Sequence, residues 1–175
     1  MKTVYILATL DTKGVEAAFV RDQLARLKVP AQIVDTGCIG TPAVEADIPR
    51  AEVFRLAGTS LAAMREKNDR GEAVKAAAKG VTALMADLYA RGDVGGVLGL
   101  GGSAGTIIGT SAMRALPVGV PKVMVSTLAS GTVRQFVGDK DILMVNSIVD
   151  ILGINRISRP ILTNAARAVA GMERV

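Results

Sequence analysis

The sequence contains no histidine and no tryptophan, and it has a single cysteine, Cys38, in 175 residues. Without histidine, Ser-His-Asp and Cys-His catalysis, histidine general acid–base chemistry and histidine metal ligands are excluded. One cysteine allows neither an internal disulfide nor a zinc site made of cysteines, and it fits the reducing cytoplasm, where we expect the protein to be located. Any catalysis would have to use aspartate, lysine, serine or threonine, with or without magnesium.

Aromatic residues are also scarce. They make up 3% of the chain, whereas hydrophobic residues make up 50%, so the core of this globular domain must be aliphatic. The formal net charge is +5, but the basic residues are scattered among acids and form no block. Because few aromatic rings are present to stack on bases, nucleic-acid binding is weakly supported. An anionic small molecule fits a mildly basic surface equally well.

One uncharged run, residues 94–113, is long enough to span a bilayer. Seven of its residues are glycine and several others are serine or threonine, so a strand, a loop and a helix explain the same letters. The apolar start "TVYILATL" imitates a signal peptide but lacks a cleavage pattern, and a first strand explains it better. We therefore expect no membrane association.

Hydrophobic patterning predicts alternating strands and helices. Strands are expected at 3–9, 31–37, 95–101 and 121–127, and helices at 14–28, from 70 to about 91, at 103–116 and at 158–172. Residues 50–67 are expected to form short helical pieces, and 142–153 a strand followed by a turn or a short helix. Asp69 with Glu72 resembles a capping box, and Ser158 is the expected cap of the last helix. This order predicts a single α/β domain with Rossmann-like, three-layer architecture, a mainly parallel sheet and helices on both faces.

The segments that follow four predicted strands are rich in small polar residues. They are 9–14, 35–37, 99–106 and 126–132. Ligands of open α/β sheets bind outside the carboxyl ends of the strands, so we expect a binding site at this edge.

The glycine loop at 101–106 is the strongest of these signals. Backbone N–H groups of a glycine turn, together with the positive end of the following helix, can cradle a phosphate, and Ser103 and Thr106 can add hydroxyl donors. The alternative is that the glycines only permit close packing of the helix on the sheet, particularly Gly105 and Gly109. The loop is not a Walker A motif. It fits G-x-G-x-x-A, but Pro121 and Lys122 stand where a dinucleotide site needs an acid, so NAD is disfavoured.

Two other segments offer complementary groups. Lys13 can reach a phosphate, and Asp11 could bind magnesium that phosphates already hold. The alternative is an ordinary helix start, with Asp11 or Thr12 as its N-cap and Lys13 in solvent. The segment 126–132 offers hydroxyls and a further glycine turn, or is an ordinary polar connection.

Several motifs together resemble one family of proteins. "ATLDTKG", "LGLGGSAGT", "PKVMVSTLASGT", "VGDKDILMVNSIVDILGIN" and "ISRPILTNAARAVAGM" are similar to segments of a mostly uncharacterised bacterial and fungal family that includes the ATP-binding N-terminal region of the tomato tobamovirus-resistance protein. The sequence departs from it at 134–136, where relatives tend to have Pro-Tyr. The resemblance implies a Rossmann-like subdomain, ATP with magnesium as ligand, and self-association as a homo-oligomer. It also implies a second α/β half, which this chain lacks and which a separate chain could supply.

By motif, the resemblance carries over twelve candidate nucleotide-binding residues: Thr9, Asp11, Thr12, Lys13, Gly101, Gly102, Ser103, Gly105, Thr106, Thr127, Ser130 and Gly131. It assigns no catalytic residue and no metal ligand. The leading hypothesis is a domain that binds ATP or another nucleotide through its phosphates. The alternatives are part of a hydrolase or transferase that acts on a phosphorylated or carboxylated small molecule, and a subunit that only docks a partner.

Overall fold

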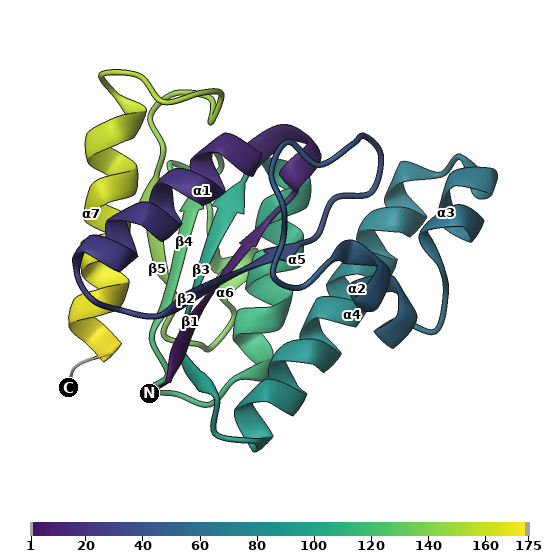
Figure 1. Ribbon diagram of the computed structural model, residues 1–175, viewed down its shortest axis with the longest axis horizontal. Helices are drawn as coiled ribbons and strands as arrows, with labels where there is room; N and C mark the ends of the chain where they lie inside the picture. Colours follow the sequence, from purple (N-terminus) through teal and green to yellow (C-terminus); the bar gives the residue numbers. More distant parts are fainter. Residues whose placement is uncertain (1, 174–175) are drawn as a thin grey trace.

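A five-stranded, wholly parallel sheet forms the centre of the molecule (Figure 1). The computed structural model describes residues 2–173. The strands are β1 (Thr3–Ala8), β2 (Ala31–Asp35), β3 (Val94–Gly101), β4 (Lys122–Ser126) and β5 (Leu143–Asn146), in the spatial order β2-β1-β3-β4-β5. All four predicted strands are confirmed, and the apolar segment after residue 141 is a strand followed by turns rather than by a short helix.

The register of the strands aligns their carboxyl ends. Ala8 pairs with Asp35, Leu7 with Gly99, and Gly101 with Ser126, which in turn pairs with Asn146. The loops that follow the five strands therefore start side by side, as the polar segments in the sequence predicted.

Helices cover both faces of the sheet (Figure 1). On one face lie α1 (Leu10–Arg26) and α7 (Ser158–Glu173), whose apolar residues pack on Val4, Ile6 and Ala8 of β1. On the other face lie α4 (Arg70–Ala90) and α5 (Ser103–Ala115), which pack with Tyr5 and Leu7. The remaining helices are short: α2 (Arg50–Leu56), α3 (Leu61–Lys67) and α6 (Arg134–Val137). Alternate residues of each buried strand thus supply two separate aliphatic cores.

The predicted start of the first helix needs correction. Helix α1 begins at Leu10 rather than Gly14, and its N-cap is Thr9, not Asp11 or Thr12. The backbone N–H of Leu10 donates to Asp35 Oδ1 (3.1 Å), so a carboxylate that is distant in the chain satisfies the first amide of the helix. Lys13 interrupts the turn with a non-helical φ of −128°, which explains why the regular pattern of the sequence starts only after it.

Of the two other predicted caps, one is confirmed and one is wrong. Asp69 caps α4 as expected, because its Oδ1 accepts the N–H of Glu72 (3.0 Å). Ser158 does not cap α7, since its hydroxyl donates to the carbonyl of Gly153. Asn155 takes that role instead, and its Oδ1 accepts the N–H groups of Ile157 and Ser158.

The uncharged run 94–113 forms strand β3 and most of helix α5. Within residues 2–173, no helix is both long and apolar enough to cross a membrane. The strand–loop–helix interpretation of this run is therefore confirmed.

Helix α4 packs tightly against α2 at Gly80, where an added Cβ would overlap the backbone carbonyl of Val53. We predict that Gly80→Ala destabilises the fold by about 1–3 kcal/mol, because backbone cannot move aside as a flexible side chain could. The control is Gly171→Ala in α7, where a Cβ would meet no atom within 4 Å and which should gain roughly 0.5–1 kcal/mol. Urea unfolding of both variants checks this, and equal effects would contradict the packing argument.

Candidate functional site

The candidate site lies where the strand order reverses. From β1 the chain passes through α1 to β2 on one side, and from β3 it passes through α5 to β4 on the other. Because α1 and α5 cover opposite faces, their N-terminal ends diverge at the carboxyl edge between β1 and β3. Such a reversal is where doubly wound sheets bind their ligands.

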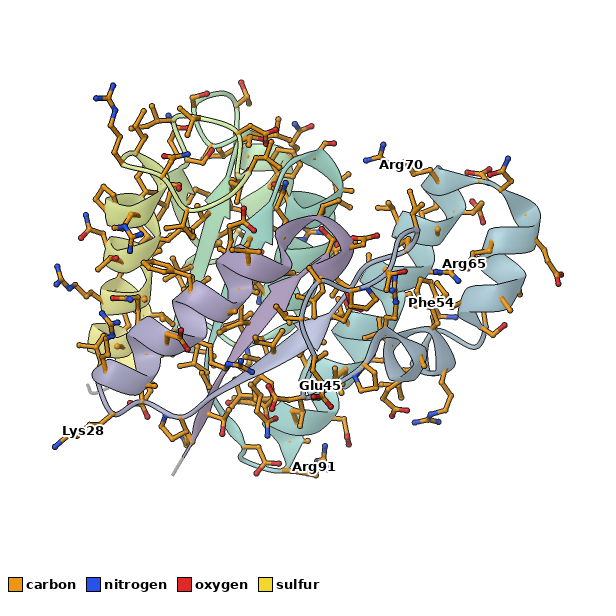
Figure 2. The ribbon with its side chains drawn as sticks, turned by 45° about the horizontal axis from the view of Figure 1, so that its top comes forward. Lys28, Glu45, Phe54, Arg65, Arg70 and Arg91 are labelled. Atoms are coloured by element: carbon orange, nitrogen blue, oxygen red, sulfur yellow. The ribbon has the colours of Figure 1, made fainter. Side chains whose placement is uncertain are left out.

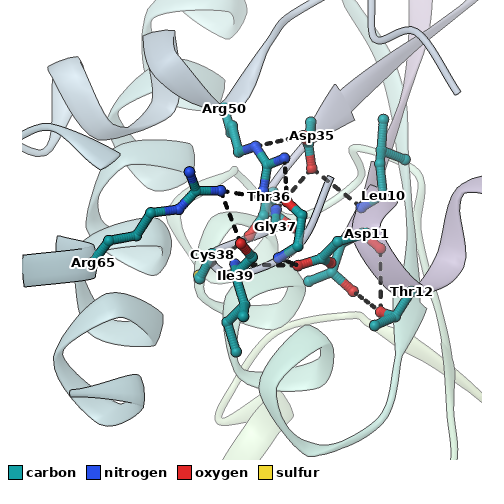
Figure 3. Close-up of polar contacts among 12 residues, drawn as sticks. Leu10, Asp11, Thr12, Asp35, Thr36, Gly37, Cys38, Ile39, Arg50 and Arg65 are labelled. Atoms are coloured by element: carbon teal, nitrogen blue, oxygen red, sulfur yellow. Dashed lines mark hydrogen bonds and ion pairs between the residues drawn. The ribbon is translucent and has the colours of Figure 1, made fainter. Parts of the chain in front are cut away.

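The first turn of α1 is tied to the loop after β2 through Asp11 (Figure 3). Asp11 Oδ2 accepts the N–H groups of Ile39 (3.2 Å) and Gly40 (3.0 Å). Beside it, the hydroxyls of Thr9 and Thr12 share a 2.8 Å hydrogen bond. Asp11 thus positions the neighbouring loop, and one of its oxygens is already engaged.

Below these loops lies a buried ion pair that the sequence did not reveal. Arg50 Nε lies 3.3 Å from Asp35 Oδ2, and a second guanidinium nitrogen donates to the carbonyl of Gly40 (2.6 Å; Figure 3). Both side chains are more than nine-tenths buried. Burial raises the pKa of Asp35, against the lowering effect of the Gly37 and Leu10 N–H groups and of Arg50. The pair fixes the end of β2 to the loop that Asp11 holds.

The glycine loop forms the first turn of α5. The first helical hydrogen bond of α5 runs from Thr106 N to Gly102 O (2.8 Å), so the amides of Ser103, Ala104 and Gly105 precede it. Ser103 is exposed, and Ala104 and Gly105 are half-buried. The turn is therefore open to solvent at the residues where a phosphate would bind.

Thr106, expected as a hydroxyl donor to a ligand, is fully buried. Its Oγ1 donates to the carbonyl of Gly102 (2.7 Å) and lies 2.6 Å from Ser126 Oγ. Ser126 Oγ also accepts the N–H of Leu128 (2.9 Å). Thr106 therefore joins the glycine loop to the loop after β4.

The glycines of the loop serve different purposes. An added Cβ at Gly101 would lie 2.6 Å from the Cα of Gly105, and one at Gly105 would lie 2.9 Å from the carbonyl oxygen of Leu100. At Gly109 it would lie 3.0 Å from the sulfur of Met124. The packing interpretation therefore holds for these three. Gly102 differs, because a Cβ there would meet only Thr127 Oγ1, at 3.6 Å.

Two pockets lie at the carboxyl edge of the sheet near the glycine loop, and Ala104 is the one residue of 101–106 that lines either of them. One, of about 80 Å³, joins Ala104 and Ile108 of α5 to the first two loops. Its other lining residues are Thr9, Asp11, Thr12, Cys38, Ile39, Arg70 and Val74. The second, of about 300 Å³, lies between the loops that follow β4 and β5 and contains Thr127 and Ser130. Seven of the twelve predicted residues line neither pocket: Lys13, Gly101, Gly102, Ser103, Gly105, Thr106 and Gly131.

Arg70 is a cationic residue of this edge that sequence reasoning missed. It begins α4 and lies at the opposite end of the molecule from Arg91, which follows the same helix (Figure 2). A larger hollow, of about 720 Å³, lies beside Asp35, Arg50 and residues 42–46 and contains none of the twelve predicted ligand residues. The pocket that Ala104 lines adjoins the turn of α5, and the pocket that Thr127 lines is linked to that turn by the hydrogen bond from Thr127 N to the carbonyl of Gly101 (3.3 Å).

Residues 2–175 match the N-terminal domain of an uncharacterised protein family, UPF0261. The chain belongs to the UPF0261 family. A UPF0261 protein of Clostridium tetani is 46% identical over 171 residues, which cover 98% of this chain and 42% of that relative. A UPF0261 protein of Rhizobium meliloti is 44% identical over 172 residues, with the same coverage.

The ToMV susceptible protein tm-1(GCR26) of Solanum lycopersicum is 32% identical over 187 residues, which cover 97% of this chain and 24% of that protein. The resemblance to the family of the tomato protein is thus confirmed. This UPF0261 chain spans less than half the length of the curated relatives it matches.

Cys38 lies in the loop that Asp11 holds, and its thiol has a raised pKa. Burial, followed by the charge of Asp11, raises the pKa of Cys38 to about 11 from 9.0. At pH 8 the thiolate fraction should therefore be about 100-fold lower than in the unfolded chain. We predict that iodoacetamide alkylates native Cys38 at least about 100-fold more slowly than the urea-unfolded protein, as measured by mass spectrometry. Similar rates in both states would contradict the buried environment.

Proposed function

We propose that this UPF0261 domain binds a nucleotide through its phosphates, with ATP as the favoured ligand, at the first turn of α5. The observation that carries the proposal is the open glycine turn at the reversal of strand order, between β1 and β3. The amides of Ser103, Ala104 and Gly105 have no acceptor within the helix, and the helix dipole adds positive potential at the same place. Gly102 leaves room for a phosphate to approach the backbone.

Arg70 supports the same ligand. It lines the small pocket together with Ala104, and a guanidinium can form paired hydrogen bonds with phosphate oxygens. Lys13 follows Asp11 by two residues and is half-buried. It is the second cation that we propose for the site. The ligand thus has a hydrogen-bonding turn and positive charge on one edge of the sheet.

Magnesium fits this site only as a companion of the phosphates. Among residues 2–173, no three acidic or cysteine side chains are grouped as a metal site. Asp11 Oδ2 already accepts two backbone N–H groups, which leaves Oδ1 as the one carboxylate oxygen of this residue without such a bond. Magnesium bound with ATP would neutralise phosphate charge and draw most of its ligands from phosphate and water.

A negative charge at the α5 N-terminus should separate ligand binding from stability. We predict that Ser103→Asp weakens ATP binding at least tenfold, because the carboxylate repels phosphates, while the unfolding free energy stays equal or rises, because an acid suits a helix N-terminus. Isothermal titration calorimetry and urea unfolding measure the two effects.

The matched control for this variant is Ser60→Asp. Ser60 caps α3, where its hydroxyl accepts the N–H of Ala63 (3.1 Å), so aspartate puts the same charge at a different helix N-terminus. ATP affinity should not change in this variant. If wild type gives no heat at millimolar ATP, or if both variants lose affinity equally, the proposed site is wrong.

A second proposal is that the site belongs to an enzyme, a hydrolase or transferase, which a further region completes. Its specific support is the set of large apolar side chains exposed near the same edge: Ile39, Ile107, Ile148 and Leu152. The matched relatives are more than twice as long as this chain, so a further region is available in them to cover these side chains. Alternatively, a second copy of this chain covers these side chains, with this edge of the sheet as the contact between the two copies.

Turnover distinguishes the two proposals. We predict that this chain alone leaves ATP intact, because the described residues offer no histidine base and no grouped metal ligands. Chromatography of ATP after prolonged incubation with the protein and magnesium tests this. Release of ADP by wild type but not by Ser103→Asp would instead favour the enzyme.

A further inference from the structure

The pocket between the loops after β4 and β5 contains four polar groups with unused hydrogen-bonding capacity. It measures about 300 Å³ and is lined by Thr127, Ser130, Asn146, Ser147, Ile148, Val149 and Asp150. Within residues 2–173, the hydroxyls of Thr127 and Ser130 and the carboxylate of Asp150 form no hydrogen bond or ion pair. Asn146 Oδ1 accepts the N–H of Ile148 (3.0 Å), which leaves its NH₂ group free to donate.

Ser147 has a different role, because it shapes the pocket. It is buried, and its hydroxyl donates to the carbonyl of Val149 (2.7 Å). Between them, Ile148 has a left-handed φ of +63°, which a β-branched residue rarely adopts. The side chain of Asn146 and the hydroxyl of Ser147 hold this turn, and the turn places Asn146 and Asp150 in the lining of the same pocket.

The chemistry of the lining selects a neutral ligand that carries hydroxyl groups. No lysine or arginine lines the pocket in the described chain, and Asp150 would repel an anion there. A hydroxyl group can donate to the Asp150 carboxylate and accept from Asn146, Thr127 or Ser130. Two adjacent hydroxyls suit a carboxylate best, because each of its oxygens can accept one of them.

This pocket adjoins the glycine turn through Thr127. Thr127 N donates to the carbonyl of Gly101 (3.3 Å), and Thr127 Oγ1 is the nearest atom to the position of a Cβ on Gly102. A group bound in the pocket can therefore be covalently attached to a phosphate held by the turn of α5. We propose that the pocket binds the vicinal diol of the ribose of the nucleotide, with the Asp150 carboxylate accepting a hydrogen bond from each hydroxyl. This inference rests on the proposed nucleotide function and adds the part of the ligand that distinguishes it from a simple polyphosphate.

Three ligands separate the phosphate site from the diol site: ATP, 2′,3′-dideoxy-ATP and inorganic tripolyphosphate, each titrated calorimetrically with magnesium. We expect wild type to bind ATP about tenfold or more tightly than dideoxy-ATP, because hydrogen bonds to a charged group are lost. Asp150→Asn should weaken ATP by a similar factor, have little effect on dideoxy-ATP, and leave tripolyphosphate unchanged or tighter. Asp139→Asn removes the same charge from an exposed residue outside this pocket and should change none of the three.

The outcomes distinguish the two proposals. Equal affinity of wild type for ATP and dideoxy-ATP, with measurable tripolyphosphate binding, overturns the diol site and leaves the phosphate site standing. The same holds if Asp150→Asn weakens tripolyphosphate as much as ATP. Failure of all three ligands to bind overturns both. The comparison of ATP with dideoxy-ATP needs only wild-type protein, so it stands even if Asp150→Asn does not fold.

Discussion

The parallel pairing of β1 with β3 is the constraint on which the rest of the site depends. These two strands are adjacent in the sheet although the whole of α1, β2 and α2–α4 separates them in the chain. Their alignment, with Leu7 opposite Gly99, places the start of α1 next to the start of α5. Without this pairing, Asp11 at the start of α1 and Ala104 of the glycine turn would not line the same pocket.

A series of hydrogen bonds and one buried ion pair connects the start of α1 to β2 and to the loop that follows β2. Asp35 accepts the amides of Leu10 and Gly37, Arg50 binds Asp35 and the carbonyl of Gly40, and Asp11 accepts the amide of Gly40. One nitrogen of the Arg50 guanidinium, Nη1, is buried without a partner among the described residues. An unmet buried donor costs about 1–3 kcal/mol. It is tolerated because removing Arg50 would leave Asp35 buried without its counter-charge, which costs more.

Local signals in the sequence predicted much of this architecture, and long-range contacts set the rest. Buried strands are continuous apolar runs, the Asp69 cap is three residues from the amide it binds, and both are visible in a short window of sequence. The start of α1 was wrong because its first amide is capped by Asp35, which is distant in the chain. Arg50 and Arg70 were missed for the same reason, since no spacing relates them to the loops they reach. The sequence also did not predict that the Thr106 hydroxyl points into the protein, because its partner there, Ser126, belongs to the neighbouring strand β4.

The sequence of the glycine loop allowed two interpretations, close packing of a helix on the sheet and binding of a phosphate, and different glycines fit each of them. Gly101, Gly105 and Gly109 lack side chains because backbone or Met124 already occupies the space where a Cβ would lie. Close packing of α5 on β3 and β4 therefore accounts for them without any ligand. At Gly102 only Thr127 Oγ1 lies within 4 Å of the position of an added Cβ, so packing does not demand glycine there. The proposed phosphate, bound by the exposed amides of the next three residues, would approach the backbone at Gly102 most easily without a side chain there.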